Sequence, residues 1–132
     1  MKNFKRQIEM SVFAFLFSFF AVVAADAHGD NKPGPHGGHI RMPGPYHTEA
    51  VAGPKGFKIF LLDINFEKPM VQNSEVKASV RTKGKTIELK CKKNSDHFFC
   101  PVEDSPQSGK LILQTIRDSV RGSDTQYDLP LQ

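Results

Sequence analysis

The sequence lacks the motifs on which most enzymes depend, and this absence narrows the functions open to it. We find no paired carboxylates, no glycine-rich phosphate loop, no serine nucleophile elbow and no second cysteine pair at zinc-binding spacing. The net charge of +4 at pH 7 is a mild excess that indicates no particular partner, and the basic residues between 81 and 93 are best interpreted as a solvated strand face. We therefore expect a protein that is not an enzyme and binds no nucleic acid.

Long hydrophobic runs are also scarce. The one that is present covers residues 10–24, which is too short for a transmembrane helix of about 20 apolar residues. It follows a basic start and is followed by small residues as far as Ala27, which is the pattern of a secretory signal peptide over residues 1–27. No cysteine lies near the cleavage site, so we expect no lipid attachment. The sequence predicts a periplasmic or secreted protein with no membrane anchor after signal cleavage.

Two cleavage positions fit the small-residue pattern, and each leaves a histidine close to the new amino terminus. Cleavage after Ala27 makes His28 the first residue, whose amine and ring nitrogen can chelate one metal ion. Cleavage after Ala25 leaves Asp26, Ala27 and His28, whose nitrogen atoms can surround Cu(II) in a square plane. We prefer the first position because it continues the A-x-A pattern of signal cleavage sites.

Histidine is concentrated at the start of the mature chain. Residues 28–45 are rich in glycine, proline and histidine, so we expect a flexible, extended arm. Glycines let neighbouring imidazoles converge on one ion, and imidazole is the commonest metal-coordinating side chain. A nearby methionine adds a thioether suited to Cu(I), and the Irving–Williams order favours copper, with zinc as a further candidate. The candidate metal ligands are His28, His36, His39, Met42 and His47. The alternative is a solvated arm whose histidines reflect composition alone.

The chain has two cysteines, Cys91 and Cys100, and an exported pair is normally a disulfide. They flank a turn signal at residues 94–96, so we predict a cross-strand disulfide that stabilises the fold by about 2.5 kcal/mol. The alternative is a thiolate metal site with His97 as a third ligand. Because thiols seldom stay reduced outside the cytosol, we interpret His97 as structural.

The rest of the chain predicts an all-β domain over residues 46–132. Short strand-like runs recur at close spacing, separated by turn residues, which is typical of an antiparallel sandwich, and we find no amphipathic helix. The strongest run is apolar on both faces, as in a central strand covered on each side, whereas later runs alternate apolar and polar residues. The predicted strands cover residues 46–49, 57–64, 75–81, 86–92, 98–102 and 111–116, and the first would hold the ring of His47 rigidly. The tail from residue 122 is expected to be an edge strand or loose.

The run GPHGGHIRMPGPYHTE followed by FKIFLLDIN resembles the small periplasmic domains that accompany bacterial copper and heavy-metal efflux. The resemblance covers residues 34–65 and implies a β-sandwich that holds or passes metal, with His36, His39 and His47 as ligands and an efflux or envelope protein as a partner. A looser similarity to periplasmic copper carriers that use an N-terminal histidine on an immunoglobulin-like sandwich points to His28.

Two hypotheses about function follow. The first is a periplasmic protein that captures, stores or delivers copper, as Cu(I) or Cu(II), for homeostasis or resistance. The second is an exported β-sandwich that binds an envelope protein through its edge strands or basic face and has no role in metal binding. A small copper-dependent oxidase is disfavoured because the chain is short for a substrate surface.

Overall fold

The computed structural model describes residues 33–131, which fold into ten antiparallel strands. No helix within these residues is long and apolar enough to cross a membrane. The strands are β1 (His39–Arg41), β2 (His47–Gly53), β3 (Gly56–Leu62), β4 (Glu75–Thr82), β5 (Lys85–Leu89), β6 (Lys92–Lys93), β7 (Phe98–Pro101), β8 (Lys110–Arg117), β9 (Val120–Arg121) and β10 (Thr125–Asp128). The predicted all-β fold is thereby confirmed. The predicted signal peptide and His28 lie outside the described residues.

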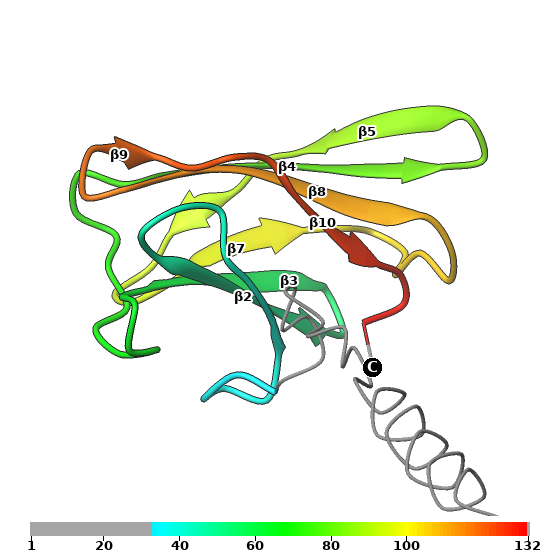
Figure 1. Ribbon diagram of the computed structural model, residues 1–132. Coiled ribbons are helices and arrows are strands. Elements are labelled where there is room, and N and C mark those ends of the chain that lie inside the picture. Colours follow the sequence, from blue (N-terminus) through cyan, green and yellow to red (C-terminus); the bar gives the residue numbers. More distant parts are fainter. Residues whose placement is uncertain (1–32, 132) are drawn as a thin grey trace, which may run out of the picture.

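The strands form two sheets that pack face to face (Figure 1). The first sheet has the order β1-β2-β3-β7-β6, and the second has the order β10-β8-β4-β5, with β9 paired to β8. The chain crosses between the sheets after β3, after β5 and after β7. The tail forms β10 at the edge of the second sheet, as one of the two sequence predictions had it.

The core between the sheets comes from alternating side chains. In β4, Val76, Ala78 and Val80 are buried, whereas the charged residues of the strand, Glu75, Lys77 and Arg81, are exposed. Their partners from the first sheet include Ile59 and Leu61, which have no exposed surface. Burial of apolar area is the main stabilising term in such a sandwich.

One predicted strand is divided between the two sheets. Residues 86–92 alternate cleanly, but the chain leaves the second sheet after Leu89 and enters the first sheet at Lys92. Ile87 lies opposite Val80 in the register of β4 and β5, on the inward face of the sheet, yet 52% of this residue is exposed. The reason is that β5 is an edge strand, so part of its inward face lies beyond the opposite sheet.

The two cysteines form the predicted disulfide, Cys91–Cys100. The register of β6 and β7 pairs Lys92 with Phe99, so the cysteines are directly opposite each other. Both sulfur atoms are used in this bond, which excludes the thiolate metal site considered as an alternative.

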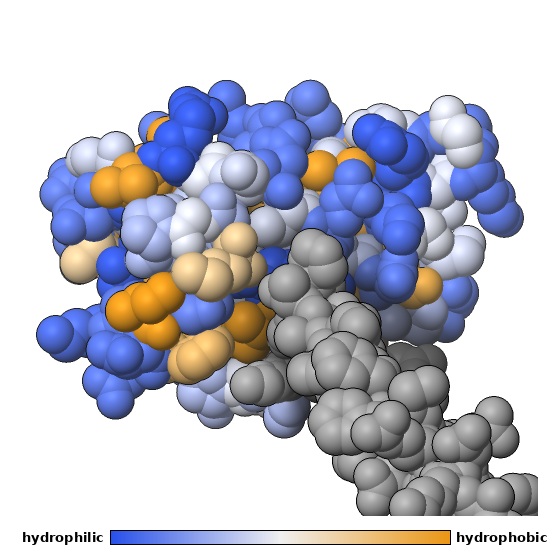
Figure 2. Space-filling view, in the orientation of Figure 1, coloured by the Kyte–Doolittle hydropathy of each residue, from blue (hydrophilic) through white to orange (hydrophobic). Residues whose placement is uncertain are grey.

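The first sheet also has an apolar outer face, which lies away from the core. Ile40, Phe60 and Leu62 form a second buried cluster there, with Val51 against it. This confirms that β3 is a central strand covered on both sides. In Figure 2 the largest hydrophobic area on the visible face lies at the lower left, over the end of the first sheet. Three exposed apolar residues belong to loops at that end: Met42, Ile64 and Phe66.

The structured part of the chain begins earlier than the sequence predicts. Residues 39–41 form β1, which pairs with β2, and Pro33 makes an isolated bridge with His39. Composition favoured an open arm as far as residue 45, because this stretch has few large apolar residues to bury. Its order comes instead from backbone pairing and from one buried carboxylate.

Candidate metal site

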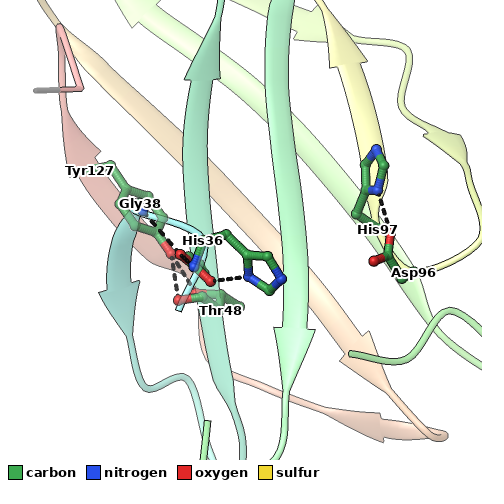
Figure 3. Close-up of polar contacts among 7 residues, drawn as sticks. His36, Gly38, Thr48, Asp96, His97 and Tyr127 are labelled. Carbon is green, nitrogen blue, oxygen red and sulfur yellow. Dashed lines mark hydrogen bonds and ion pairs between the residues drawn. The ribbon is translucent and has the colours of Figure 1, made fainter. Parts of the chain in front are cut away.

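Glu49 lies at the centre of the candidate site. It belongs to β2 and points to the outer face of the first sheet, yet it has no exposed surface. Its Oε1 accepts hydrogen bonds from the backbone N–H groups of His36 (2.8 Å) and Gly38 (3.0 Å), and its Oε2 lies 2.7 Å from Nδ1 of His36 (Figure 3). A buried carboxylate is stable only when donors surround it. Here all three donors come from one short loop.

Glycine residues allow this loop, residues 34–38, to close around the carboxylate. The N–H of Gly34 donates to the carbonyl of Gly38, and the N–H of Gly37 donates to the carbonyl of Gly34. Gly37 has a φ of 77°, a conformation that favours glycine. A Cβ atom on Gly34 would lie 2.3 Å from Cδ of Glu49. The Gly-x-His-Gly-Gly motif therefore has a structural reason that its sequence alone does not reveal.

The imidazole of His36 is held on both sides. Its ring stacks on Phe60, with centroids 3.7 Å apart and an interplanar angle of 3°. Its side chain is 33% exposed, whereas its partner Glu49 is buried. Because Nδ1 contacts the carboxylate, Nε2 is the nitrogen left to bind a ligand. Metal-bound histidines commonly donate their second ring nitrogen to a carboxylate in this way.

His39 does not join His36. It pairs with Ala50 in the register of β1 and β2, and Ala50 belongs to the core between the sheets. Side chains at paired positions lie on the same face of a sheet, so His39 is directed inward at the sheet edge. His36 contacts the outer face instead. The close sequence spacing of the two histidines therefore does not bring them together.

His47 lies on the outer face of the first sheet but in separate surroundings. It is buried, with 7% exposed, and its ring stacks on Phe66 at 4.1 Å. Its Nδ1 lies 3.1 Å from the carbonyl oxygen of Asp63. These contacts hold the ring in place, as its predicted position in a strand implies. Because only 7% of His47 is exposed, a metal ion has little access to the ring.

Asp63 follows directly after β3 and supports this turn. Its carboxylate accepts the N–H groups of Asn65 (2.8 Å) and Glu67 (2.9 Å). These bonds, that from Glu67 above all, lower the pKa of Asp63 below its ordinary value of 3.8. Backbone donors of the turn therefore satisfy the Asp63 carboxylate at the end of the strand. Met42 lies in the connection from β1 to β2 and is 59% exposed.

The sequence analysis interprets His97 as a structural residue. In the fold it lies beside the same aromatic ring as His36. The centroids of Phe60 and His97 are 5.2 Å apart, at an angle of 40°. Nδ1 of His97 lies 2.7 Å from Asp96, and the side-chain amide of Asn94 lies 3.0 Å from its Nε2. The bond from His97 lowers the pKa of Asp96, and the charges of His97 and His36 lower it further. Only the pairing of β3 with β7 reveals this proximity.

Within residues 33–131, no three His, Cys, Asp or Glu side chains are arranged so that they could hold a metal ion together. His28, the other proposed ligand, lies outside this range. Comparisons with protein-family models, with curated proteins and with solved structures found no match.

Proposed function

We propose that this chain is an exported metal-binding protein that takes copper and uses His36 as its anchoring ligand. The observation that supports the proposal is the fully buried Glu49 carboxylate, 2.7 Å from Nδ1 of a partly exposed histidine. Export is supported by the disulfide, which fits an oxidising compartment outside the cytosol.

The preference for copper comes from the chemistry of the available donors. Imidazole binds Cu(I), Cu(II) and Zn(II), and among divalent ions the Irving–Williams order places copper above zinc. Met42 carries an exposed thioether, which is a soft ligand for Cu(I). Zinc remains the competing ion.

His36 alone gives one nitrogen, so further ligands must come from elsewhere. In the proposal, cleavage after Ala27 makes His28 the amino terminus, which adds an amine and an imidazole. The five backbone steps from residue 28 to residue 33 span at most about 17 Å, since an extended chain covers no more than about 3.3–3.6 Å per residue.

The experiment is a copper titration of the natively exported protein with two matched variants. Because the buried carboxylate of Glu49 orients the ring of His36, we expect His36→Ala to lower the Cu(II) affinity at least tenfold. His39→Ala, three residues away and directed to the other face, is expected to change it less than threefold. A competition assay measures both values, and circular dichroism checks the fold. Equal losses in the two variants, or none in either, would contradict the assignment.

The second candidate function is a protein-interaction module, and an observation on β5 favours it. This edge strand is exposed along most of its length, with the side chain of Ile87 open to solvent. Next to Ile87 is a hollow lined by Val80, Val102 and Pro106, among others. If near-equimolar copper and zinc leave the melting temperature and the NMR signals of residues 33–47 unchanged, this candidate replaces metal binding.

A further inference from the structure

The second sheet ends at β5, and the outer edge of this strand is open. The sheet order places β5 beside β4 alone, and no residue within 33–131 hydrogen-bonds to its other side (Figure 1). The hairpin from β4 to β5 has a two-residue loop, Lys83 and Gly84, both with positive φ. In such a hairpin the pair that flanks the loop is hydrogen-bonded, and the pairs then alternate. The backbone N–H and C=O groups of Thr86 and Glu88 therefore point to the open edge.

The inward face of β5 leaves a place for one more apolar side chain. Ile87 lies opposite Val80 in the register, on the inward face, yet 52% of it is exposed. Beside it is a hollow of about 360 Å³, lined also by Val80, Val102 and Pro106 among others. A strand added along β5 would place every second side chain on this inward face. An apolar side chain opposite Ile87 would cover it and enter the hollow.

Basic side chains lie around both ends of β5. Residues 81–93 contain six basic residues and one acidic residue, Glu88, and all seven are exposed. Lys85 begins the strand, and Lys90 follows directly after its end. Asp104 also lines the hollow, but the basic charge stays in excess. The surroundings therefore favour an occupant that has acidic residues on both sides of an apolar centre.

A second copy of this chain is a poor occupant of the same edge. Lysines on an edge strand discourage pairing between like strands, because each copy brings the same positive charges. In the symmetric antiparallel pair that sets Ile87 opposite its own copy, Lys85 lies opposite Leu89 and meets no acidic residue. A partner that carries negative charge has no such conflict.

We propose that the open edge of β5 binds an extended acidic segment of another protein as an added strand, with an apolar residue of that segment in the hollow beside Ile87. Main-chain hydrogen bonds to Thr86 and Glu88 hold the added strand, and alternate side chains give specificity. The inference goes beyond copper binding and does not depend on it, since His36 contacts the first sheet and β5 belongs to the second. It names a partner class for the protein-interaction function.

The experiment titrates the purified protein with a synthetic peptide that has a valine at its centre, threonines beside it and aspartates at both ends. We expect saturable binding that protects the backbone amides of Thr86 and Glu88 from hydrogen exchange, measured by NMR. Thr86→Pro removes an outward N–H that β4 does not use, so it should keep the fold and weaken binding about tenfold. The matched variant Thr86→Val keeps the N–H and is expected to bind within about threefold of the unaltered chain.

Two control peptides need no change in the protein. One has lysines in place of the aspartates, and the other is N-methylated along its centre, so that it cannot donate main-chain hydrogen bonds. Both are expected to bind at least about tenfold more weakly. Equal binding of the N-methylated peptide would mean that charge alone holds it, and equal binding of the lysine peptide would mean that charge has no part. Either result overturns the inference.

The remaining outcomes are also distinct. No binding at millimolar peptide, or unaltered binding by Thr86→Pro, overturns the inference. Sedimentation of the peptide-free chain is expected to show a monomer, and a dimer that Thr86→Pro dissociates would show that a second copy occupies β5 instead. Thr86→Pro is expected to leave the copper affinity unchanged, so failure of this inference and failure of copper binding are separate results.

Discussion

Burying a carboxylate completely costs folding free energy at any position, and Glu49 is such a carboxylate. The effective cost of burying an ion is several kcal/mol, which the two N–H groups and the ring of His36 offset. The geometry serves two purposes at once: it fixes the loop of residues 34–38 on the sheet and it orients one imidazole.

Glu49→Gln separates these purposes. Glutamine keeps the shape of the side chain and one oxygen for the backbone donors, but its NH₂ group cannot accept a hydrogen bond from Nδ1 of His36. We expect the free energy of unfolding to fall by about 1–3 kcal/mol and the copper affinity to fall about 10–100-fold. Chemical denaturation and a competition titration measure the two effects.

The matched control is Glu88→Gln on the exposed strand β5, which should change neither quantity. If Glu49→Gln lowers stability but leaves copper binding intact, Glu49 serves the fold alone.

At the scale of the element, the loop of residues 34–38 makes a prediction of its own. A Cβ on Gly37 meets nothing within 4 Å, so Gly37→Ala has only the left-handed backbone to oppose it, which costs about 1–2 kcal/mol. A Cβ on Gly38 lies 2.4 Å from the carbonyl oxygen of Ala50, and backbone must move to admit it. We expect Gly38→Ala to cost about 2–3 kcal/mol.

Urea denaturation measures both changes, and copper titration shows whether the loop is needed for the site. Since Gly38→Ala displaces the N–H that binds Glu49, it should weaken copper binding more than Gly37→Ala does. The reverse order for either quantity would mean that the loop is not held as described.

Most strands of this fold could be predicted from the sequence, whereas the site could be predicted only in part. Alternation identified β4 and β8, and the apolar run identified β3, because their burial follows from local pattern. The crossing at residues 90–91 was missed, since alternation continues through it. The number of histidines between residues 28 and 47 predicted a site there. The side chains of His36 and His39, however, are directed to opposite faces of the first sheet. His97 needs the pairing of β3 with β7, which no local pattern encodes.

At the scale of the whole molecule, the sandwich gives a rigid frame to a site on its outer face. The disulfide fixes β6 against β7 next to His97, and β2 and β3 carry Glu49 and Phe60. Two buried tyrosines tie the sheets together, since Tyr46 meets Thr115 at 2.8 Å and Tyr127 meets Thr48 at 2.5 Å. Rings placed on such a frame need little ordering when an ion arrives, which favours affinity.

The central claim is that imidazoles near the mature amino end bind one transition-metal ion. Native mass spectrometry of the exported protein, purified without a tag and without chelators, tests it most directly, because one spectrum gives both the cleavage site and the bound ion. The account predicts a chain that begins at His28 and carries one copper ion, which acid removes as the imidazoles become protonated. A metal-free chain that also takes up neither copper nor zinc when they are added would contradict it.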